Sequence, residues 1–485
     1  METRLLLLAF LMTASCASLR ETTAIDRLKP CKHDDGPIEG YCGTMDVWED
    51  RDAKAGRKIA LKIIVFPALK RKAAKDPLFF LAGGPGQGAA SIAGMARDLV
   101  RRIGADRDLV FVDQRGTGKS NPLECKRDDD ETDESSEAAV EKVRVCLEKL
   151  KAKADLTKYT TPIAMDDLED VRQYLGYGKI NLYGGSYGTR AAIVYARKYA
   201  ANTRAIILDG VAPTDMRLPL YMARDGQRAL SLLFRDCAAA KPCNDRFPNL
   251  PQRLDALLKA PPRKIRYTHP RTGVEKEVEV KRITLGGLIF ATLYSPKLAA
   301  LVPLLIEQAE KGNYSGFFAL GSGFESSIGG IAQGMHFSVV CSEDATRIEP
   351  GSIERETANT FLGPEMADWR MKICGFWPHG KVDAAYFPDA PSDIPTLILS
   401  GELDPVTPPV WGEQIAKQWK NARHIVVPAT GHGAGVGGCM PKLMAQFLNE
   451  ASTANLDTAC VQNVKRPPFI LGPSGPDPMG DAPAK

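Results

Sequence analysis

The segment GGSYG at 184–188 has the G-x-S-x-G pattern, in which small residues let the chain turn sharply and leave a serine hydroxyl exposed. A serine hydroxyl is a weak nucleophile near neutral pH, so it needs a general base, and the base needs an acid that orients it. Ser186 is followed along the chain by Asp404 in GELDPVTPP and by His432 in TGHG. The sequence therefore predicts a triad of Ser186, Asp404 and His432 that performs acyl transfer.

Each of the three residues follows a predicted strand. The apolar strand 179–184 precedes the serine, and a helical segment follows it, as a nucleophile turn requires. Strand 396–401 (TLILSG) precedes Asp404, and strand 424–429 (HIVVPA) precedes His432. Because the carboxyl ends of parallel strands meet at one edge of a sheet, we expect the three side chains to lie together there.

Two other carboxylates compete for the role of the acid. Asp209 is a rival because it ends the predicted strand 205–210, and Glu402 is a weaker one. Among the six histidines, only His432 follows a predicted strand within a glycine-rich loop. Asp404 is the preferred acid, and Asp209 remains the alternative.

A tetrahedral intermediate also needs two backbone N–H donors for its oxyanion. One is expected at Tyr187, the residue after the nucleophile. The loop LAGGPGQG at 81–88, which follows a short apolar strand, should supply the other. Pro85 has no N–H, so the donor is Gly84 or Gly83, and Gly84 is favoured.

The order of predicted elements indicates an α/β fold with a long insertion. Strands that are continuously apolar alternate with helices up to about residue 215, which is typical of a mostly parallel sheet covered by helices on both faces. The alternation stops there and resumes at 396. We expect the chain to divide into an α/β core at 30–214 and 391–465, a largely helical lid at 215–390, and a Pro/Gly-rich tail at 466–485.

The N-terminus has the form of a secretory signal peptide. Arg4 is followed by an apolar run at 5–12 and then by small residues, with a cleavage site after Ala17. In an alternative interpretation Cys16 is the residue at which a bacterial lipoprotein is cut and lipidated, although Thr13 fits that pattern poorly. Both interpretations predict an exported protein, periplasmic or secreted, and the second adds a lipid anchor.

Cysteine usage agrees with export. Without Cys16 the chain has ten cysteines, an even number, and no C-x-x-C pair, which favours disulfides over zinc or thioredoxin chemistry. The spacing falls into neighbouring pairs. Nearest-neighbour pairing would join 31 to 42, 125 to 146, 237 to 243, 341 to 374 and 439 to 460.

The segment FVDQRGTGKS at 111–120 ends like a phosphate-binding loop but fails its spacing rule. Asp113 stands where the first glycine is required, and a carboxylate there would repel phosphate. The net charge of +4, from 63 basic and 59 acidic residues, is too balanced to indicate a nucleic acid or an anionic membrane. No internal stretch reaches the ~18 apolar residues of a spanning helix. We expect no nucleic-acid partner, membrane span, metal or cofactor.

Taken together, GGPG, DQRGTGKS, GGSYGT, GELDPVTPP and TGHG resemble the proline-iminopeptidase-related serine peptidases of the α/β-hydrolase fold, over roughly 30–465. The chain is most similar to their exported tripeptidyl aminopeptidase branch. The resemblance implies an exopeptidase that cleaves N-terminal residues or short peptides through an acyl-enzyme. It also implies that Asp113 and Arg115 make local polar contacts that shape the oxyanion loop. One departure is Ala82, where many relatives carry His, so a supporting role of that position is in doubt.

The resemblance also implies a site for the free ammonium of the peptide substrate, since the family uses acidic lid residues for this purpose. The lid segment 336–347 offers Glu343 and Asp344 after Cys341, and Glu343 is the first candidate. Two surface acids would be an equally simple interpretation of this segment. A triad alone does not name the acyl group, so a carboxylesterase or lipase is the second hypothesis. A catalytically inactive binding protein is the third, and the complete triad speaks against it.

Overall fold

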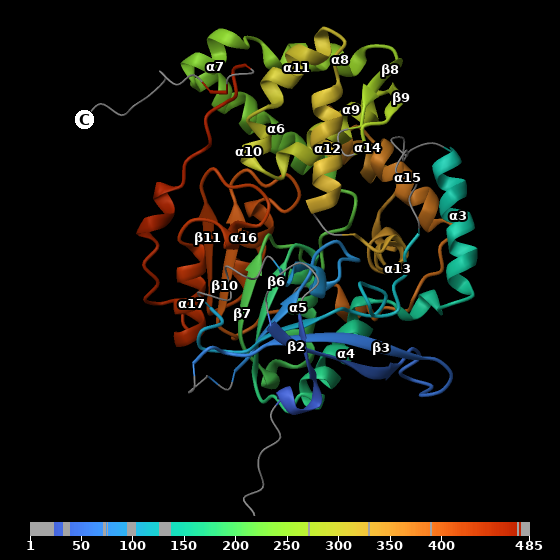
Figure 1. Cartoon of the computed structure of the whole chain (residues 1–485), viewed down its shortest axis with the longest axis vertical. Coiled ribbons are helices and arrows are strands. Elements are labelled where there is room, and N and C mark those ends of the chain that lie inside the picture. Colours follow the sequence, from blue (N-terminus) through green and yellow to red (C-terminus); the bar gives the residue numbers. More distant parts are fainter. Residues whose placement is uncertain are drawn as a thin grey trace, which may run out of the picture.

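The computed structural model describes residues 24–476 except 33–38, 71–73, 75, 95–102, 126–136, 270–271, 328–329, 389 and 473–474 (Figure 1). The predicted signal peptide at 1–17, including Cys16, lies outside these residues. Within the described part, no helix is long and apolar enough to cross a membrane.

A nine-stranded sheet with the order β1-β2-β3-β5-β4-β6-β7-β10-β11 forms the centre of the protein. In this spatial order, β5, β4, β6, β7, β10 and β11 run parallel to one another. Strands β1, β2 and β3 add an antiparallel edge. In sequence order the strands are β1 Lys29–Lys32, β2 Glu39–Trp48, β3 Lys58–Phe66, β4 Leu78–Leu81, β5 Leu109–Val112, β6 Ile180–Gly185, β7 Thr203–Asp209, β10 Thr396–Gly401 and β11 Ala422–Val427.

Helices cover both faces of this sheet, which explains why its central strands are apolar throughout. On one face, α4, α5 and α16 enclose a core with sheet residues such as Leu182 and Ile398. On the other face, α17 packs over Phe80 and Leu399. The helices of the core are α1 Ala89–Ile92, α3 Glu137–Lys151, α4 Thr161–Tyr174, α5 Tyr187–Lys198, α16 Pro409–Gln418 and α17 Met440–Glu450.

The insertion consists of two parts. Its first part lies over the sheet at the top of Figure 1 and has its own apolar core. It comprises α6 Met222–Ala239, α7 Lys241–Arg246, α8 Leu250–Lys259, β8 Arg263–Thr268, β9 Glu275–Val280, α9 Arg282–Leu293, α10 Pro296–Ala299, α11 Val302–Glu310 and α12 Ser315–Ser327. In the second part, α13 Gln333–Glu343 and α15 Glu365–Cys374 belong to the core of the sheet domain, and α14 Ser352–Thr357 lies between them in sequence.

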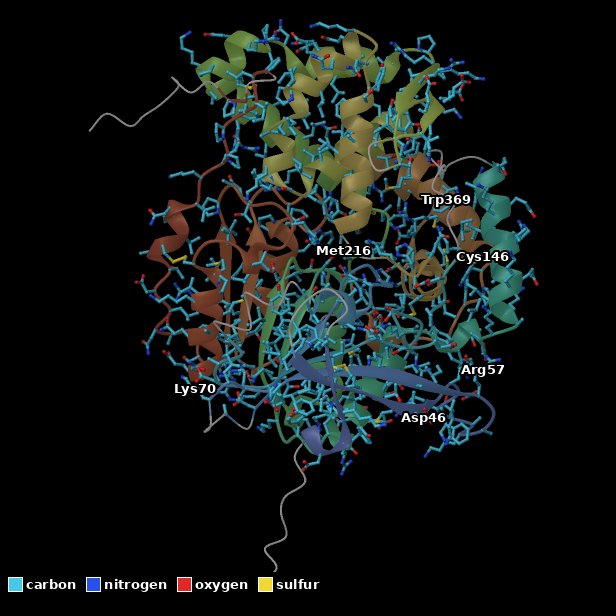
Figure 2. All side chains as sticks on the ribbon, viewed as in Figure 1. Asp46, Arg57, Lys70, Cys146, Met216 and Trp369 are labelled. Carbon is cyan, nitrogen blue, oxygen red and sulfur yellow. A yellow bond between two sulfur atoms is a disulfide. The ribbon has the colours of Figure 1, made fainter. Side chains whose placement is uncertain are left out.

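Covalent and tail contacts complete the fold. The structure contains the five nearest-neighbour disulfides that the sequence predicts. The start of the predicted tail is ordered on the lid, because Phe469 is buried in the lid core and Arg466 Nε donates to Asp236 Oδ2 at 2.8 Å. Side chains fill the space between lid and sheet, and Met216 lies there (Figure 2), fully buried.

Candidate active site

Ser186 stands in a sharp turn between β6 and α5. Its φ of 56° and ψ of −126° are strained values for a residue other than glycine. The neighbouring glycines permit close packing, because a Cβ on Gly188 would lie 2.0 Å from the Leu81 carbonyl oxygen of β4. The Ser186 N–H donates to the Asp209 carbonyl at 2.9 Å. The local sequence thus builds the strained turn that holds Ser186, which is half-buried.

His432 and Asp404 lie in the loops after β11 and β10, and their side chains are in direct contact. The distance from His432 Nδ1 to Asp404 Oδ2 is 2.8 Å. Asp404 is fully buried, and its Oδ1 accepts the N–H groups of Val406 and Thr407 at 2.8 and 2.9 Å. Thr407 Oγ1 donates to Oδ2 at 2.8 Å. The carboxylate is therefore held as an acceptor, which places the imidazole proton on Nδ1 and leaves Nε2 as the basic nitrogen.

The electrostatics of this pair favour the ionised acid. Burial raises the pKa of Asp404, but the adjacent His432 and the hydrogen bonds outweigh it, so the pKa lies below its usual value. Burial lowers the pKa of His432, but Asp404 outweighs it, so the pKa of His432 lies above its usual value. Each residue thus stabilises the charged form of the other.

Asp209, the rival acid, has a different set of contacts. Its carboxylate accepts the N–H groups of Ala434 and Gly435 at 2.7 and 2.9 Å and the Tyr183 hydroxyl at 2.7 Å. It therefore anchors the backbone after His432, whereas Asp404 contacts the imidazole itself. Glu402, the other candidate, accepts the Ala429 N–H at 2.9 Å with its Oε2.

The loop after β4 lies against the nucleophile. A Cβ on Gly83 would lie 3.2 Å from Ser186 Cβ, and the Gly83 N–H donates to Gln87 Oε1 at 3.2 Å. Gly84 has a φ of 108°, which only glycine adopts readily. Tyr187 follows Ser186 as the first residue of α5. Because Gln87 already accepts the Gly83 N–H, Gly84 stays the predicted second oxyanion donor.

The DQRG segment is a buried turn beside this loop. Asp113 accepts the N–H groups of Ala90 and Lys119 at 2.8 and 2.9 Å. Arg115 is fully buried and makes two hydrogen bonds to Asp167, at 2.6 and 2.8 Å. Asp113 thus makes the local polar contacts that the resemblance implies, whereas Arg115 joins this turn to α4. No group of three or more His, Cys, Asp or Glu in the described residues could hold a metal ion.

The sequence matches two family models and is similar to proteins with known names. A family model described as alpha/beta hydrolase fold matches residues 76–240, and one described as TAP-like protein matches residues 359–460. Serine protease Hip1 of Mycobacterium tuberculosis is 25% identical over 487 residues, covering 89% of this chain and 90% of that protein. Proline iminopeptidase of Neisseria gonorrhoeae is 30% identical over 136 residues, covering 28% of this chain and 32% of that protein.

The protein is a serine hydrolase of the α/β-hydrolase fold, and its sequence is similar to proteins named as serine peptidases. The two family models match both parts of the sheet domain and extend into the two ends of the insertion. Among solved structures, a proline iminopeptidase of Mycobacterium smegmatis is similar to this α/β hydrolase, with 15% identity, a TM-score of 0.39, and coverage of 84% of this chain and 98% of that one.

The structure gives Glu343 other partners than the substrate ammonium that the sequence analysis expected for it. Its side chain is fully buried at the end of α13 and accepts hydrogen bonds from Thr161 N–H at 2.6 Å, Thr161 Oγ1 at 2.9 Å and Tyr386 OH at 2.5 Å. Asp344 is equally buried and pairs with Arg190 at 2.9 Å. A substrate ammonium would have to displace these partners. We therefore leave Glu343 out of the ammonium site.

Two residues that the sequence did not single out contact Asp404 or His432. Thr407 Oγ1 lies 3.1 Å from His432 Nδ1 as well as 2.8 Å from Asp404, and its place in GELDPVTPP was a usable signal. Tyr294, after α9 in the lid, accepts the His432 N–H at 3.0 Å with its carbonyl oxygen, and the two rings meet edge to face at 5.2 Å. No local sequence pattern predicts that Tyr294 contacts the loop of His432, which lies more than a hundred residues later in the chain.

Proposed function

We propose that the protein is an exported serine exopeptidase that cleaves residues or short peptides from the N-termini of peptides. The observation that carries the proposal is the His432–Asp404 pair at 2.8 Å, in a fold that presents Ser186 at a strained turn. The similarity to proteins named serine protease and proline iminopeptidase favours a peptide as the substrate.

In this proposal the chain's own residues account for each proton and charge. Ser186 Oγ attacks the scissile carbonyl while His432 Nε2 takes its proton, and Asp404 stabilises the resulting imidazolium. The N–H groups of Tyr187 and Gly84 receive the oxyanion, each donor being worth ~3–4 kcal/mol of barrier. His432 then protonates the leaving amine, and water releases the acyl group from Ser186 by the same steps.

A substrate panel tests the reaction class. It pairs each free-amine peptide with its N-acetylated form and adds short-chain p-nitrophenyl esters. An exopeptidase should cleave the free-amine peptides and leave the acetylated ones intact. Turnover of esters alone would instead establish the carboxylesterase or lipase alternative, and cleavage of both peptide forms would exclude a requirement for the free amine.

Labelling of the nucleophile tests the site. Wild-type protein should react with a fluorophosphonate at Ser186, and Ser186→Ala should lose both labelling and turnover while keeping the thermal melting curve. If the Ser186→Ala protein were still labelled, another residue would be the nucleophile and the proposed triad would be wrong.

Export is supported by the N-terminal segment and by five disulfides, which persist in oxidising compartments. Fractionation of bacteria that express the full chain, or the chain without residues 1–17, should recover only the former outside the cytoplasm. Partition of the mature protein into detergent, and its loss in Cys16→Ala, would reveal a lipid anchor.

A further inference from the structure

Glu343 receives a set of hydrogen bonds that leads directly to the nucleophile turn. The Thr161 N–H and hydroxyl both donate to its carboxylate, at 2.6 and 2.9 Å. The Thr161 oxygen also lies 2.6 Å from the Tyr187 hydroxyl. Because the Thr161 proton goes to Glu343, Thr161 must accept the proton of Tyr187. The three side chains thus form a directed chain from Tyr187 to Thr161 to Glu343.

The same end of α13 also holds the next turn of α5. Arg190, three residues after Tyr187, donates to both oxygens of Asp344 at 3.0 and 2.9 Å and lies 3.8 Å from Glu343. All of these side chains are buried, where charges interact strongly and an unpaired carboxylate is costly. Burial raises the pKa of Glu343, and the Arg190 guanidinium opposes this rise. Contacts with the end of α13 therefore hold the start of α5 at Tyr187 and, one turn later, at Arg190.

The opposite end of α13 reaches the other half of the oxyanion site. Ala332 N–H, at the start of α13, donates to the Gly86 carbonyl at 3.0 Å, and His336 Nδ1 lies 3.3 Å from the Pro85 carbonyl. Burial lowers the pKa of His336 to about 3, so the ring is neutral and donates through an Nδ1–H tautomer. One helix thus contacts the loop that carries Gly84 and, through Glu343, the residue that follows Ser186.

We propose that Glu343 is a positioning residue for the oxyanion hole, which it stabilises by fixing Tyr187 through Thr161. The inference rests on the proposed function, in which the Tyr187 N–H stabilises the intermediate. It gives the buried acid a role in the rate of the acyl-transfer step and none in the recognition of the substrate's N-terminus.

A glutamine cannot reproduce this arrangement. Glu343 accepts three hydrogen bonds on two oxygens, whereas an amide has one oxygen and a nitrogen that donates. If the amide oxygen keeps the Thr161 N–H, its nitrogen faces the hydroxyls of Thr161 and Tyr386. The Thr161 hydroxyl must then accept from the amide, and its own proton turns toward the Tyr187 oxygen, so the hydrogen bond between Thr161 and Tyr187 reverses. The Tyr187 proton loses Thr161 as its acceptor, and the turn that carries the Tyr187 N–H shifts.

The test compares Glu343→Gln with a matched control. Glu169→Gln makes the same change at a buried glutamate on α4 whose carboxylate has side-chain partners on Arg172, Gln173, Tyr195 and Asn202, away from the nucleophile turn. Steady-state kinetics are measured on a free-amine peptide and on a p-nitrophenyl ester, together with the rate of fluorophosphonate labelling and the Ki of a boronic acid that mimics the intermediate.

We expect Glu343→Gln to lower kcat roughly 10- to 100-fold on both substrates, because small displacements of catalytic groups have effects of this size. KM should stay nearly constant, and labelling and boronic acid affinity should fall in parallel with kcat. Thr161→Val should reproduce the loss, and Thr161→Ser, which keeps the hydroxyl, should restore it. Glu169→Gln should lower the melting temperature without changing kcat.

Several outcomes would overturn the inference. A rise in KM confined to the free-amine peptide would return Glu343 to the ammonium site. Unchanged kcat and labelling in a folded Glu343→Gln protein would remove it from the site altogether. If Glu343→Gln does not fold, Tyr187→Phe removes only the first hydroxyl of the chain, and an unchanged kcat there would refute the proposal. Absence of labelling in wild-type protein would instead refute the proposed function.

Discussion

Replacement of Asp404 by asparagine should remove the general base without removing the histidine. The Asp404 Oδ1 accepts two backbone N–H groups, from Val406 and Thr407, so the amide oxygen of an asparagine must take that position. The amide nitrogen then faces His432 Nδ1, where the carboxylate oxygen lay at 2.8 Å. Since the amide donates, Nδ1 must accept, and the imidazole proton moves to Nε2. The nitrogen that should receive the Ser186 proton is then already protonated.

The size of the effect follows from this change of tautomer. An acid-to-amide change of the same kind lowers kcat by ~10⁴ in the trypsin-type triad, which corresponds to about 5.4 kcal/mol of barrier. The fold should survive, because the backbone N–H groups keep their acceptor and Thr407 Oγ1 can rotate to accept from the amide. We therefore expect a loss of kcat of about four orders of magnitude with a small change in melting temperature.

The assay measures turnover of a p-nitrophenyl ester and a free-amine peptide, fluorophosphonate labelling and thermal unfolding. Glu402→Gln is the matched control, since it makes the same change in the same turn at a side chain that is 37% exposed. It should retain nearly full activity. A folded Asp404→Asn protein with more than a tenth of the wild-type rate would refute the assignment of the acid, and a full loss in Asp209→Asn alone would transfer the role to Asp209.

Three further predictions use the same assays. The pKa of His432 lies above its usual value of about 6.5, and the basic form of His432 is lost as the pH falls through the raised pKa. The acid limb of kcat/KM should therefore have its midpoint above about pH 6.5, and this midpoint should move to lower pH in Asp404→Asn. Asp209→Asn should lower kcat by roughly 10- to 100-fold, less than Asp404→Asn, because it loosens the loop after His432 without changing the tautomer. Arg115→Ala should lower the free energy of unfolding in urea by about 3–5 kcal/mol, because it removes a buried partner of Asp167; a loss below about 1 kcal/mol would contradict this.

The contact between Asp404 and His432 could be predicted from the sequence because it depends on local signals. Asp404 and His432 each follow an apolar strand, and parallel strands bring such turns to one edge of the sheet. The glycines around Ser186 likewise report a close approach of the backbone that the structure contains. In each case a short segment and the rules of parallel sheets determine the position of the side chain.

The role of Glu343 could not be predicted from a short segment of the sequence. Its meaning depends on Thr161 and Tyr386, which approach it from distant segments of the chain, and on burial, which a charged sequence such as CSED does not indicate. The hairpin of β8 and β9 did have a local signal, since EVEV at 277–280 alternates charged and apolar residues. The ordered start of the tail was likewise signalled by Phe469 within a segment rich in Pro and Gly.

The contacts of the lid indicate that it supports the catalytic loops as well as covering them. Tyr294 accepts the His432 N–H, and Arg228 of α6 donates to the Glu402 carbonyl at 3.0 Å, two residues before Asp404. The backbone of the His432 loop and that of the Asp404 turn are thus each joined to the lid by one hydrogen bond. A lid that only shielded the site could be exchanged without affecting the triad. If the proposed function holds, changes in the lid that alter substrate choice must preserve both contacts, which ties specificity to the geometry of Asp404 and His432.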